Sequence, residues 1–547
     1  MNSNRIGFRF SKFLMVLCLT IVVELASGQP SVIYQQCYGG TGDDLFYHAI
    51  PARNGGIITT LRATSDDGDL IDNPESSGWV IKFNSVLEIE WQKFYYNGES
   101  PIKIIENEDG SLIFGGSCSG EHIESNGSTD IMVMKTDSLG EIIWSRCYGG
   151  LLADNLISIQ ATQDQGYLIL GNSFAEGGDI PFHYGDACCE DAIIIKIDSV
   201  GEILWVKALG GSLNDSPIAN SLENKRGFYQ IHLFSSSNDY DLADCPITDI
   251  RKRWIIILDS LGNIINENHL SAEDDFLNFE DYIFQDAEFT MIPGSGNASS
   301  VIYPAPPGHS GEEGSVAIFD STLNLVNMIS FGGSNDDRFK TMVRDSSKNF
   351  YFLGYSMSPD YDLPNNYNGG EANDYWIMAT DSNLNKLWSM NFGGSSIYGD
   401  YSTNLDNSNI IFMNNSLYVF TASITPETLP DFDISCGNLD TEPDFTVDRD
   451  AWLVAFSIPT NISDLSPILP HISILPNPAK DQCIISVEDG STIDFIQIFD
   501  ALQRPVFRQP FVQNTPISLA GLNEGIYFVG LYSSTGLICC EKLVIAQ

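Results

Sequence analysis

The sequence has few basic residues, and it has no long apolar run beyond its first 28 residues. Lys and Arg number 27 against 72 Asp and Glu, which gives a formal net charge of −45 at pH 7. Because phosphate groups are bound by clustered Lys and Arg, this balance argues against a nucleic-acid partner. It argues equally against docking on anionic lipid. We expect no transmembrane segment once the N-terminal signal is removed, since no later stretch has the length and apolarity of a bilayer span.

Recognised catalytic motifs are also missing. The seven histidines are never spaced as in H-E-x-x-H, and no G-x-S-x-G occurs. No run matches a complete D-x-D-x-D-G calcium loop with its closing Glu. We therefore assign no catalytic residue. Paired carboxylates for glycoside cleavage stay open as an alternative, because residues 29–470 alone hold 64 acids and any pair of them could be nominated.

The N-terminus has the pattern of an export signal. Arg5, Arg9 and Lys12 precede the apolar run FLMVLCLTIVVELA, and the small residues Ala26-Ser27-Gly28 follow it. We predict a signal peptide over residues 1–28. Ten cysteines remain after its removal, and in an exported protein some of them are expected to form disulfides, whose pairing the sequence leaves open.

A pair of glycines that follows an apolar residue returns at a fixed interval. The pairs lie at 39–40, 149–150, 210–211, 332–333 and 393–394. Spacings of 61, 122 and 61 residues separate the last four, and Asn97-Gly98 and Ser271-Ala272 fill the gaps as degraded copies. No Lys-Ser or Lys-Thr follows any pair, so we interpret the glycines as turns between repeats and not as phosphate-binding loops.

A second motif keeps the same interval: an apolar run of strand length, a turn rich in Asp, Ser, Gly and Asn, and a second strand. Seven copies occur, at Gly78, Asp130, Asp191, Arg253, Ser315, Asp374 and Asp450. Each repeat holds about four short strands, and a ring of such sheets buries both faces of every sheet. We predict a seven-bladed β-propeller over residues 29–458. The last copy lacks its outer strand, so residues 31–37 should complete that blade and close the ring.

The repeat stops after Pro459, and residues 459–470 form a linker that contains Pro and Ser. The remaining residues alternate apolar and polar positions between turn signals. This pattern predicts a small immunoglobulin-like β-sandwich over residues 471–547, so the fold class is all-β throughout.

The last segment carries Pro476-Asn477-Pro478, then Gly525 and Tyr527, and finally Gly536 and Lys542. With these residues it resembles the type IX secretion C-terminal sorting domain family of the Bacteroidetes. The resemblance implies that the type IX secretion machinery is a partner and that these residues belong to the sorting signal. It also implies passage through the periplasm to a secreted or outer-membrane-surface location in a Gram-negative bacterium. The repeat region is similar to propeller passengers of such proteins.

Acids recur in register with the repeats. Asp-x-Asp pairs fall in the loop between the second and third strands of a blade, at Asp67 and Asp69, Asp239 and Asp241, Asp360 and Asp362, and Asp431 and Asp433. Further acids follow the glycine turns. Because strands alternate direction, both sets should emerge on one strongly acidic face. Two interpretations stay open: the carboxylates bind calcium, the one candidate cofactor, or they cap turns through hydrogen bonds to the backbone.

These observations favour an exported, non-enzymatic binding module for a glycan or a protein, with the acidic face as the candidate site. A propeller-type polysaccharide hydrolase or lyase is the alternative, and a scaffold that only spaces other surface components is a third possibility. Arg, Tyr and carboxylates that converge at the centre of the acidic face would indicate the enzyme. A shallow face with exposed aromatic rings would indicate binding.

Overall fold

The computed structural model describes residues 30–70, 77–95, 99–119, 125–218, 221–224, 226–247, 252–271, 278–279, 284–285, 289–297, 309–363, 373–393, 408–423, 449–458, 472–475, 479–480, 482–487, 495–500, 505–512, 515–519, 521–522, 525–533 and 536–545. One compact unit covers Gln29–Ile458, and the second contains Pro459–Gln547. Among the described residues, no helix is long and apolar enough to cross a membrane. The predicted signal peptide lies outside the described residues.

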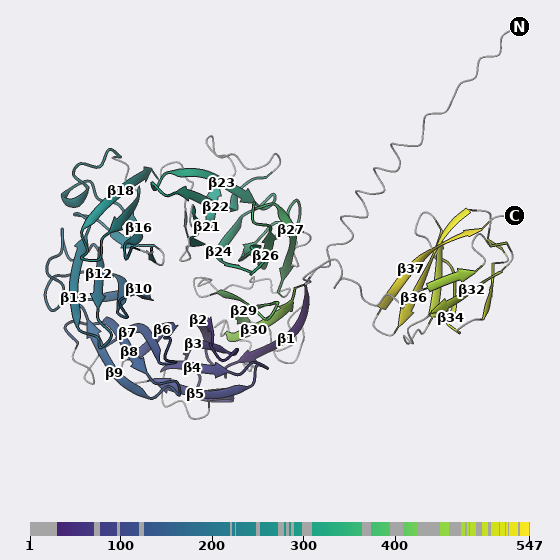
Figure 1. Ribbon diagram of the computed structural model, residues 1–547, viewed down its shortest axis with the longest axis horizontal. Helices are drawn as coiled ribbons and strands as arrows, with labels where there is room; N and C mark the ends of the chain where they lie inside the picture. The colour runs from purple at the N-terminus through teal and green to yellow at the C-terminus, as the bar shows by residue number, and fades with distance from the viewer. Residues whose placement is uncertain are drawn as a thin grey trace, which may run out of the picture. The chain divides into compact units, whose positions relative to one another are not determined.

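The first unit is a ring of seven antiparallel sheets, the seven-bladed propeller that the repeat predicts (Figure 1). We number the blades in chain order. Blade 1 holds β2 (Leu45–Pro51), β3 (Ile57–Ala63), β4 (Ser77–Phe83) and β5 (Ile89–Tyr95). Blade 2 holds β6 (Glu99–Glu106), β7 (Leu112–Cys118), β8 (Asp130–Thr136) and β9 (Ile142–Tyr148). Blade 3 holds β10 (Asp154–Ala161), β11 (Tyr167–Ser173), β12 (Asp191–Ile197) and β13 (Ile203–Leu209).

The inner strand is split into two short pieces in blades 4 and 5, whereas blade 6 again has four regular strands. Blade 4 holds β14 (Asp215–Pro217), β15 (Leu222–Glu223), β16 (Tyr229–Ser235), β17 (Lys252–Leu258) and β18 (Ile264–Ser271). Blade 5 holds β19 (Asn278–Phe279), β20 (Phe284–Gln285), β21 (Phe289–Asn297), β22 (Glu312–Asp320) and β23 (Leu325–Phe331). Blade 6 holds β24 (Asp337–Arg344), β25 (Phe350–Ser356), β26 (Asp374–Thr380) and β27 (Lys386–Phe392). Two 3-10 turns, η1 (Gly68–Leu70) and η2 (Tyr240–Leu242), precede the third strands of blades 1 and 4.

Blade 7 closes the ring with strands from both ends of the repeat region. It holds β28 (Asn409–Met413), β29 (Ser416–Ser423) and β30 (Asp450–Ser457), and its outer strand is β1 (Ser31–Tyr38). β1 pairs antiparallel with β30 from Ser31 opposite Ser457 to Tyr38 opposite Ala451. This pairing confirms the closure predicted from sequence, and it removes the open edges that an incomplete ring would expose.

Apolar side chains pack together at every junction between neighbouring blades. Among the described residues, each junction holds one buried cluster, as between blades 2 and 3, where Ile131 and Ile193 lie in the same core. The third strand of a blade reads as a continuous apolar run because both of its faces contact such clusters. Trp376 on β26 is completely buried, and replacing such a residue by Ala typically costs about 3–5 kcal/mol.

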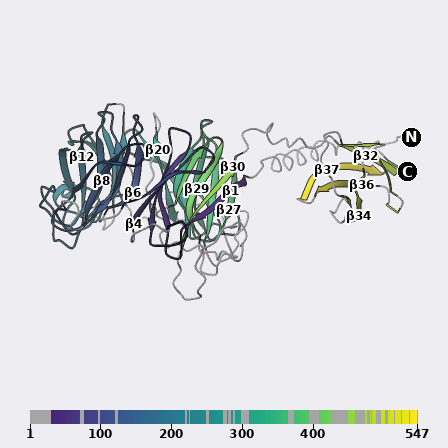
Figure 2. The ribbon, with the colours of Figure 1, turned by 90° about the horizontal axis from the view of Figure 1, so that it is seen from below.

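The turns of the propeller fall on two opposite faces, since strands alternate direction within each blade (Figure 2). One face carries the loops between second and third strands together with the turns between blades; we call it the acidic face. The other carries the turns within the two hairpins of each blade; we call it the hairpin face. The glycine pairs lie between the outer strand of one blade and the inner strand of the next, as predicted.

The second unit is a small β domain of two sheets. One sheet has the order β31 (Ile472–Leu475), β32 (Gln482–Val487), β35 (Pro516–Ser518). The other has the order β34 (Pro505–Pro510), β33 (Phe495–Asp500), β36 (Gly525–Ser533), β37 (Gly536–Ile545). Buried residues of both sheets, such as Ile485 and Val529, share one core, as expected for a sandwich.

Candidate binding face

The Asp-x-Asp turns hold the glycine turns in place. In blade 1 the Thr41 amide donates to Asp67 Oδ1 at 2.7 Å, and the Gly39 amide donates to Asp69 Oδ2 at 3.4 Å. The same bonds recur from Ser212 to Asp239 (2.8 Å), from Gly210 to Asp241 (3.2 Å), from Ser334 to Asp360 (2.9 Å) and from Gly332 to Asp362 (3.2 Å). Six of the eight predicted face residues therefore accept backbone N–H groups. Asp431 and Asp433 lie outside the described residues.

The residue between the two acids adopts a left-handed backbone. In blade 1 it is Gly68, with φ of 61°, whereas blades 4 and 6 place Tyr240 and Tyr361 there with φ of 51° and 56°. A side chain in this region costs roughly 1–2 kcal/mol compared with glycine. The two tyrosines are 60% and 58% exposed, so burial does not explain them. Because strained backbone conformations cluster at functional sites, the two exposed tyrosine rings indicate a binding role for these turns.

Aromatic neighbours extend both tyrosines into larger surfaces. The Tyr184 ring, on the loop before β12, lies 4.9 Å from Tyr240 with an interplanar angle of 34°, and Phe182 lies 5.2 Å from Tyr184 and is 40% exposed. The Tyr184 hydroxyl also bonds to Asp241. In the other pair, the His309 ring lies 4.8 Å from Tyr361. We call the rings Phe182, Tyr184 and Tyr240 the aromatic platform.

A second, buried set of acids lies beneath these turns. A β-carbon built on Gly210 would lie 2.6 Å from Asp215 Oδ2 and 2.8 Å from Asp191 Oδ1, so both carboxylates crowd the same glycine. The acids that meet at the four described junctions of this kind are Asp450 with Asp44, Asp130 with Asp154, Asp191 with Asp215, and Glu313 with Asp337. All eight are buried. Their glycines are conserved in the repeat because no side chain fits beside two acids.

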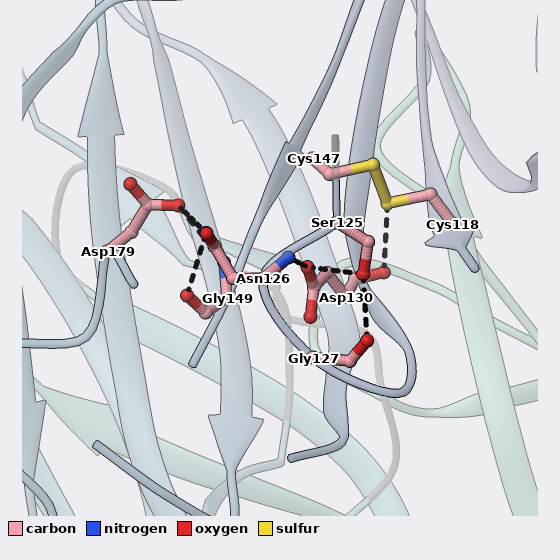
Figure 3. Close-up of a disulfide and its surroundings, with 8 residues drawn as sticks. All are labelled: Cys118, Ser125, Asn126, Gly127, Asp130, Cys147, Gly149 and Asp179. Carbon is pink, nitrogen blue, oxygen red and sulfur yellow. Dashed lines mark hydrogen bonds between the residues drawn. A yellow bond between two sulfur atoms is a disulfide. The ribbon is translucent and has the colours of Figure 1, made fainter. Parts of the chain in front are cut away.

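Figure 3 shows the hydrogen bonds that hold Asp130, one of the two acids at the junction between blades 2 and 3. Asp130 Oδ2 accepts the Asn126 amide at 2.5 Å and the Ser125 hydroxyl at 2.9 Å, and the Asn126 side chain bonds to Asp179 at 3.0 Å. A disulfide between Cys118 and Cys147 lies beside this loop. Cys37 is also disulfide-bonded, whereas Cys188, Cys189, Cys245 and Cys483 are free thiols in the described part of the chain.

Burial changes the protonation of these acids. Loss of solvent raises the pKa of Asp191 to about 7 and the pKa of Asp154 to about 6, and neighbouring carboxylates add to both shifts. The pKa of Glu313 rises to about 9 for the same reasons. His309 Nδ1 lies 2.8 Å from Glu313 Oε2, and burial lowers the pKa of His309. The two shifts together favour a neutral hydrogen bond over an ion pair.

The acidic face is built around hydrogen bonds more than around an open cation site. Asp154 and Asp215 each direct Oδ2 at a backbone amide, at 2.7 Å from Gly150 and from Gly211. Across the residues that the structure describes, no three His, Cys, Asp or Glu side chains surround a common point as a metal ion would need. The buried junction acids at 130, 191, 313 and 450 were not identified as site residues from sequence. The signal was present, since an acid opens the third-strand motif at Asp130, Asp191 and Asp450, and Glu313 lies two residues before the copy at Ser315.

Comparison with known proteins identifies the C-terminal domain. Residues 473–546 match the family described as secretion system C-terminal sorting domain. Of the sorting-signal residues predicted from the resemblance, Gly525 and Tyr527 lie on β36, and Gly536 and Lys542 lie on β37. Pro476, Asn477 and Pro478 lie outside the described residues. A search among curated protein sequences found no match.

Solved structures similar to the chain are propeller proteins and other proteins of diverse role. PorZ of Porphyromonas gingivalis, described as an essential surface component of the type-IX secretion system, is 11% identical with a TM-score of 0.40; the match covers 93% of this chain and 60% of that one. The Pan2 WD40 domain of Neurospora crassa is 10% identical with a TM-score of 0.41, covering 80% and 97%. A streptogramin B lyase is 9% identical with a TM-score of 0.39, covering 78% and 98%.

Proposed function

We propose that the protein, which carries a type IX sorting domain at residues 473–546, is delivered to the cell surface or secreted and acts there as a non-enzymatic binding module. The propeller is the passenger, and its acidic face is the binding surface. The ligand that suits this face best is a neutral or cationic glycan, and a protein ligand is the other candidate.

The observation that carries this proposal is the exposure of Tyr240 and Tyr361 on strained backbone. Gly68 holds the same turn in blade 1, so the fold does not require a side chain there. An exposed ring offers a flat apolar surface for the face of a sugar. The flanking Asp carboxylates are acceptors for sugar hydroxyl groups, although both oxygens of Asp362 are already engaged, by the Gly332 amide and the Lys386 ammonium. The strong negative charge disfavours sulfated or uronic-acid polymers.

The test is sedimentation of the purified full-length protein with a panel of insoluble polysaccharides, scoring both protein in the pellet and new reducing ends in the supernatant. Binding without new ends is expected. Tyr240→Asn with Tyr361→Asn should weaken binding about tenfold, since Asn accepts the left-handed backbone and removes only the rings. Leu261→Asn, a 73% exposed residue on the hairpin face, is the matched control and should change nothing.

Each other result has a definite meaning. New reducing ends would overturn the non-enzymatic assignment and favour the hydrolase or lyase. Sedimentation that the tyrosine variants do not weaken would place the glycan site elsewhere. No sedimentation with any polysaccharide would shift the proposal to a protein ligand or to a scaffold.

A further inference from the structure

A cavity of about 420 Å³ lies on the hairpin face between blades 5 and 6, and it differs in charge from the rest of the propeller. Its wall is apolar and includes Phe289, Ile318, Ile329 and Leu384. Two cations, Arg344 and Lys348, also line it, and none of the lining residues that the structure describes is an acid. The size falls in the range of small-molecule sites. In a chain with 72 acids against 27 basic residues, a described lining that holds two cations and no acid is unusual.

The cavity lies where a bulky side chain used elsewhere in the repeat is absent. In blades 1 to 6, one fourth-strand residue pairs with the third strand just before a register shift. In four blades it is Trp: Trp91 opposite Lys82, Trp144 opposite Lys135, Trp205 opposite Lys196 and Trp388 opposite Ala379. These tryptophans pack toward the next blade, as where the Trp205 indole donates to Ser260 O at 3.1 Å. Blades 4 and 5 have Asn266 and Asn327 instead, and Asn327 lines the cavity.

The cations are also specific to this junction. Arg344 directly precedes the turn of the first hairpin in blade 6, where the Lys348 amide bonds to Asp345 O. In the first hairpins of blades 1 to 4, the equivalent bonds are accepted by the carbonyl oxygens of Ala52, Asn107, Thr162 and Asn224. The residues that correspond to Arg344 are therefore Pro51, Glu106, Ala161 and Glu223, none of them a cation. Loss of the tryptophan and gain of the arginine coincide at one junction.

The two cations are available to a ligand. The Arg344 guanidinium lies 4.9 Å from the ring centres of both Phe284 and Phe350, which orients it without neutralising it. Neither Arg344 nor Lys348 forms an ion pair within the described part of the chain. The nearby Asp345 carboxylate accepts the Asn349 amide and side chain and the Tyr351 hydroxyl, so it is engaged within its own hairpin.

We infer that this cavity is a binding site for a small anion with an apolar body, whose carboxylate, sulfonate or phosphate group is held by Arg344 and Lys348. A guanidinium matches such groups with two parallel hydrogen bonds. The apolar body occupies the space that Trp fills in four other blades. The site is on the face opposite the tyrosines and is independent of the glycan-binding proposal.

The test uses two fluorescent probes on the full-length protein: 8-anilinonaphthalene-1-sulfonate as the anion and N-phenyl-1-naphthylamine as its neutral counterpart. The anion should bind at least tenfold more tightly. Arg344→Gln with Lys348→Gln should remove that preference and leave binding of the neutral probe within twofold. Asn327→Trp should abolish binding of both probes, because it restores the side chain used in four blades. Asn266→Trp, the same exchange one blade earlier, is the matched control and should change neither.

Three results would overturn the inference. They are equal affinity for both probes in the wild-type protein, an Asn327→Trp variant that still binds the anion, and an Asn266→Trp variant that loses it. A thermal melt of every variant separates loss of binding from loss of folding. Because the tyrosine variants of the acidic face should bind both probes normally, failure here and failure of the proposed function are distinguishable.

Discussion

Replacing Gly210 by Ala tests the physical reason for the repeated glycines. The backbone there has φ of 154°, which costs a side chain about 1–3 kcal/mol. The added methyl would also lie 2.6 Å from Asp215 Oδ2 and 2.8 Å from Asp191 Oδ1, and such overpacking costs about 1–3 kcal/mol more. We therefore expect a loss of roughly 2–6 kcal/mol in the free energy of unfolding. Urea unfolding followed by tryptophan fluorescence would measure it.

Gly55→Ala is the matched control, since its φ of 87° also disfavours a side chain but the nearest atom to the new methyl is 3.9 Å away. It should cost only about 1–2 kcal/mol. Asp191→Ala introduced together with Gly210→Ala should relieve part of the clash and so restore part of the lost free energy of unfolding. A double-mutant cycle would show a coupling of about 1–2 kcal/mol between the two substitutions. The repeat itself contains a related exchange, because Ser271 replaces the glycine where Lys252 replaces the acid opposite. Equal losses for the two glycine variants, or no coupling, would refute the reasoning.

Three further outcomes are expected. Burial raises the pKa values of the Asp154, Asp191 and Asp337 carboxyls to about 6, 7 and 6, so the native state binds these protons more tightly than the unfolded chain. The free energy of unfolding should therefore fall as pH rises from about 4 to 7. Asp191→Asn should flatten this fall in thermal melts, and an unchanged slope would contradict the assignment. The Cys118–Cys147 disulfide joins residues 29 positions apart. Replacing both cysteines by Ala should therefore lower the free energy of unfolding in urea by about 3–4 kcal/mol. Cys188→Ala, which removes an exposed free thiol, is the control and should leave it unchanged. Deleting residues 30–38 removes β1 and should speed hydrogen exchange in β30 far more than in β12, and uniform acceleration or none would count against closure by that strand.

Much of the architecture could be predicted from the sequence because the same strand and turn pattern recurs in several copies. A glycine pair and a hairpin motif at intervals of 61 residues predict strands, turns and their order, and the unpaired last copy predicts that residues 31–37 close the ring. The three Asp-x-Asp pairs that the structure describes lie in the loops where the sequence placed them. The pattern alone did not determine whether these acids bind a metal ion or cap turns. Both a metal ligand and a turn cap require the same residue type at the same place.

The sequence by itself determined the seven-bladed ring, the sorting domain and the placement of acids on one face, since these depend on local periodicity and on motifs. The tertiary structure decided which atoms meet. Asp191 and Asp215 converge on Gly210 although they lie 24 positions apart in the chain, and the rings of Tyr184 and Tyr240 meet across the junction between the neighbouring blades 3 and 4. The cavity beside Asn327 arises from packing between blades 5 and 6. Periodicity records how each strand repeats along the chain, whereas burial, pKa shifts and cavities depend on the distances between strands that only folding fixes.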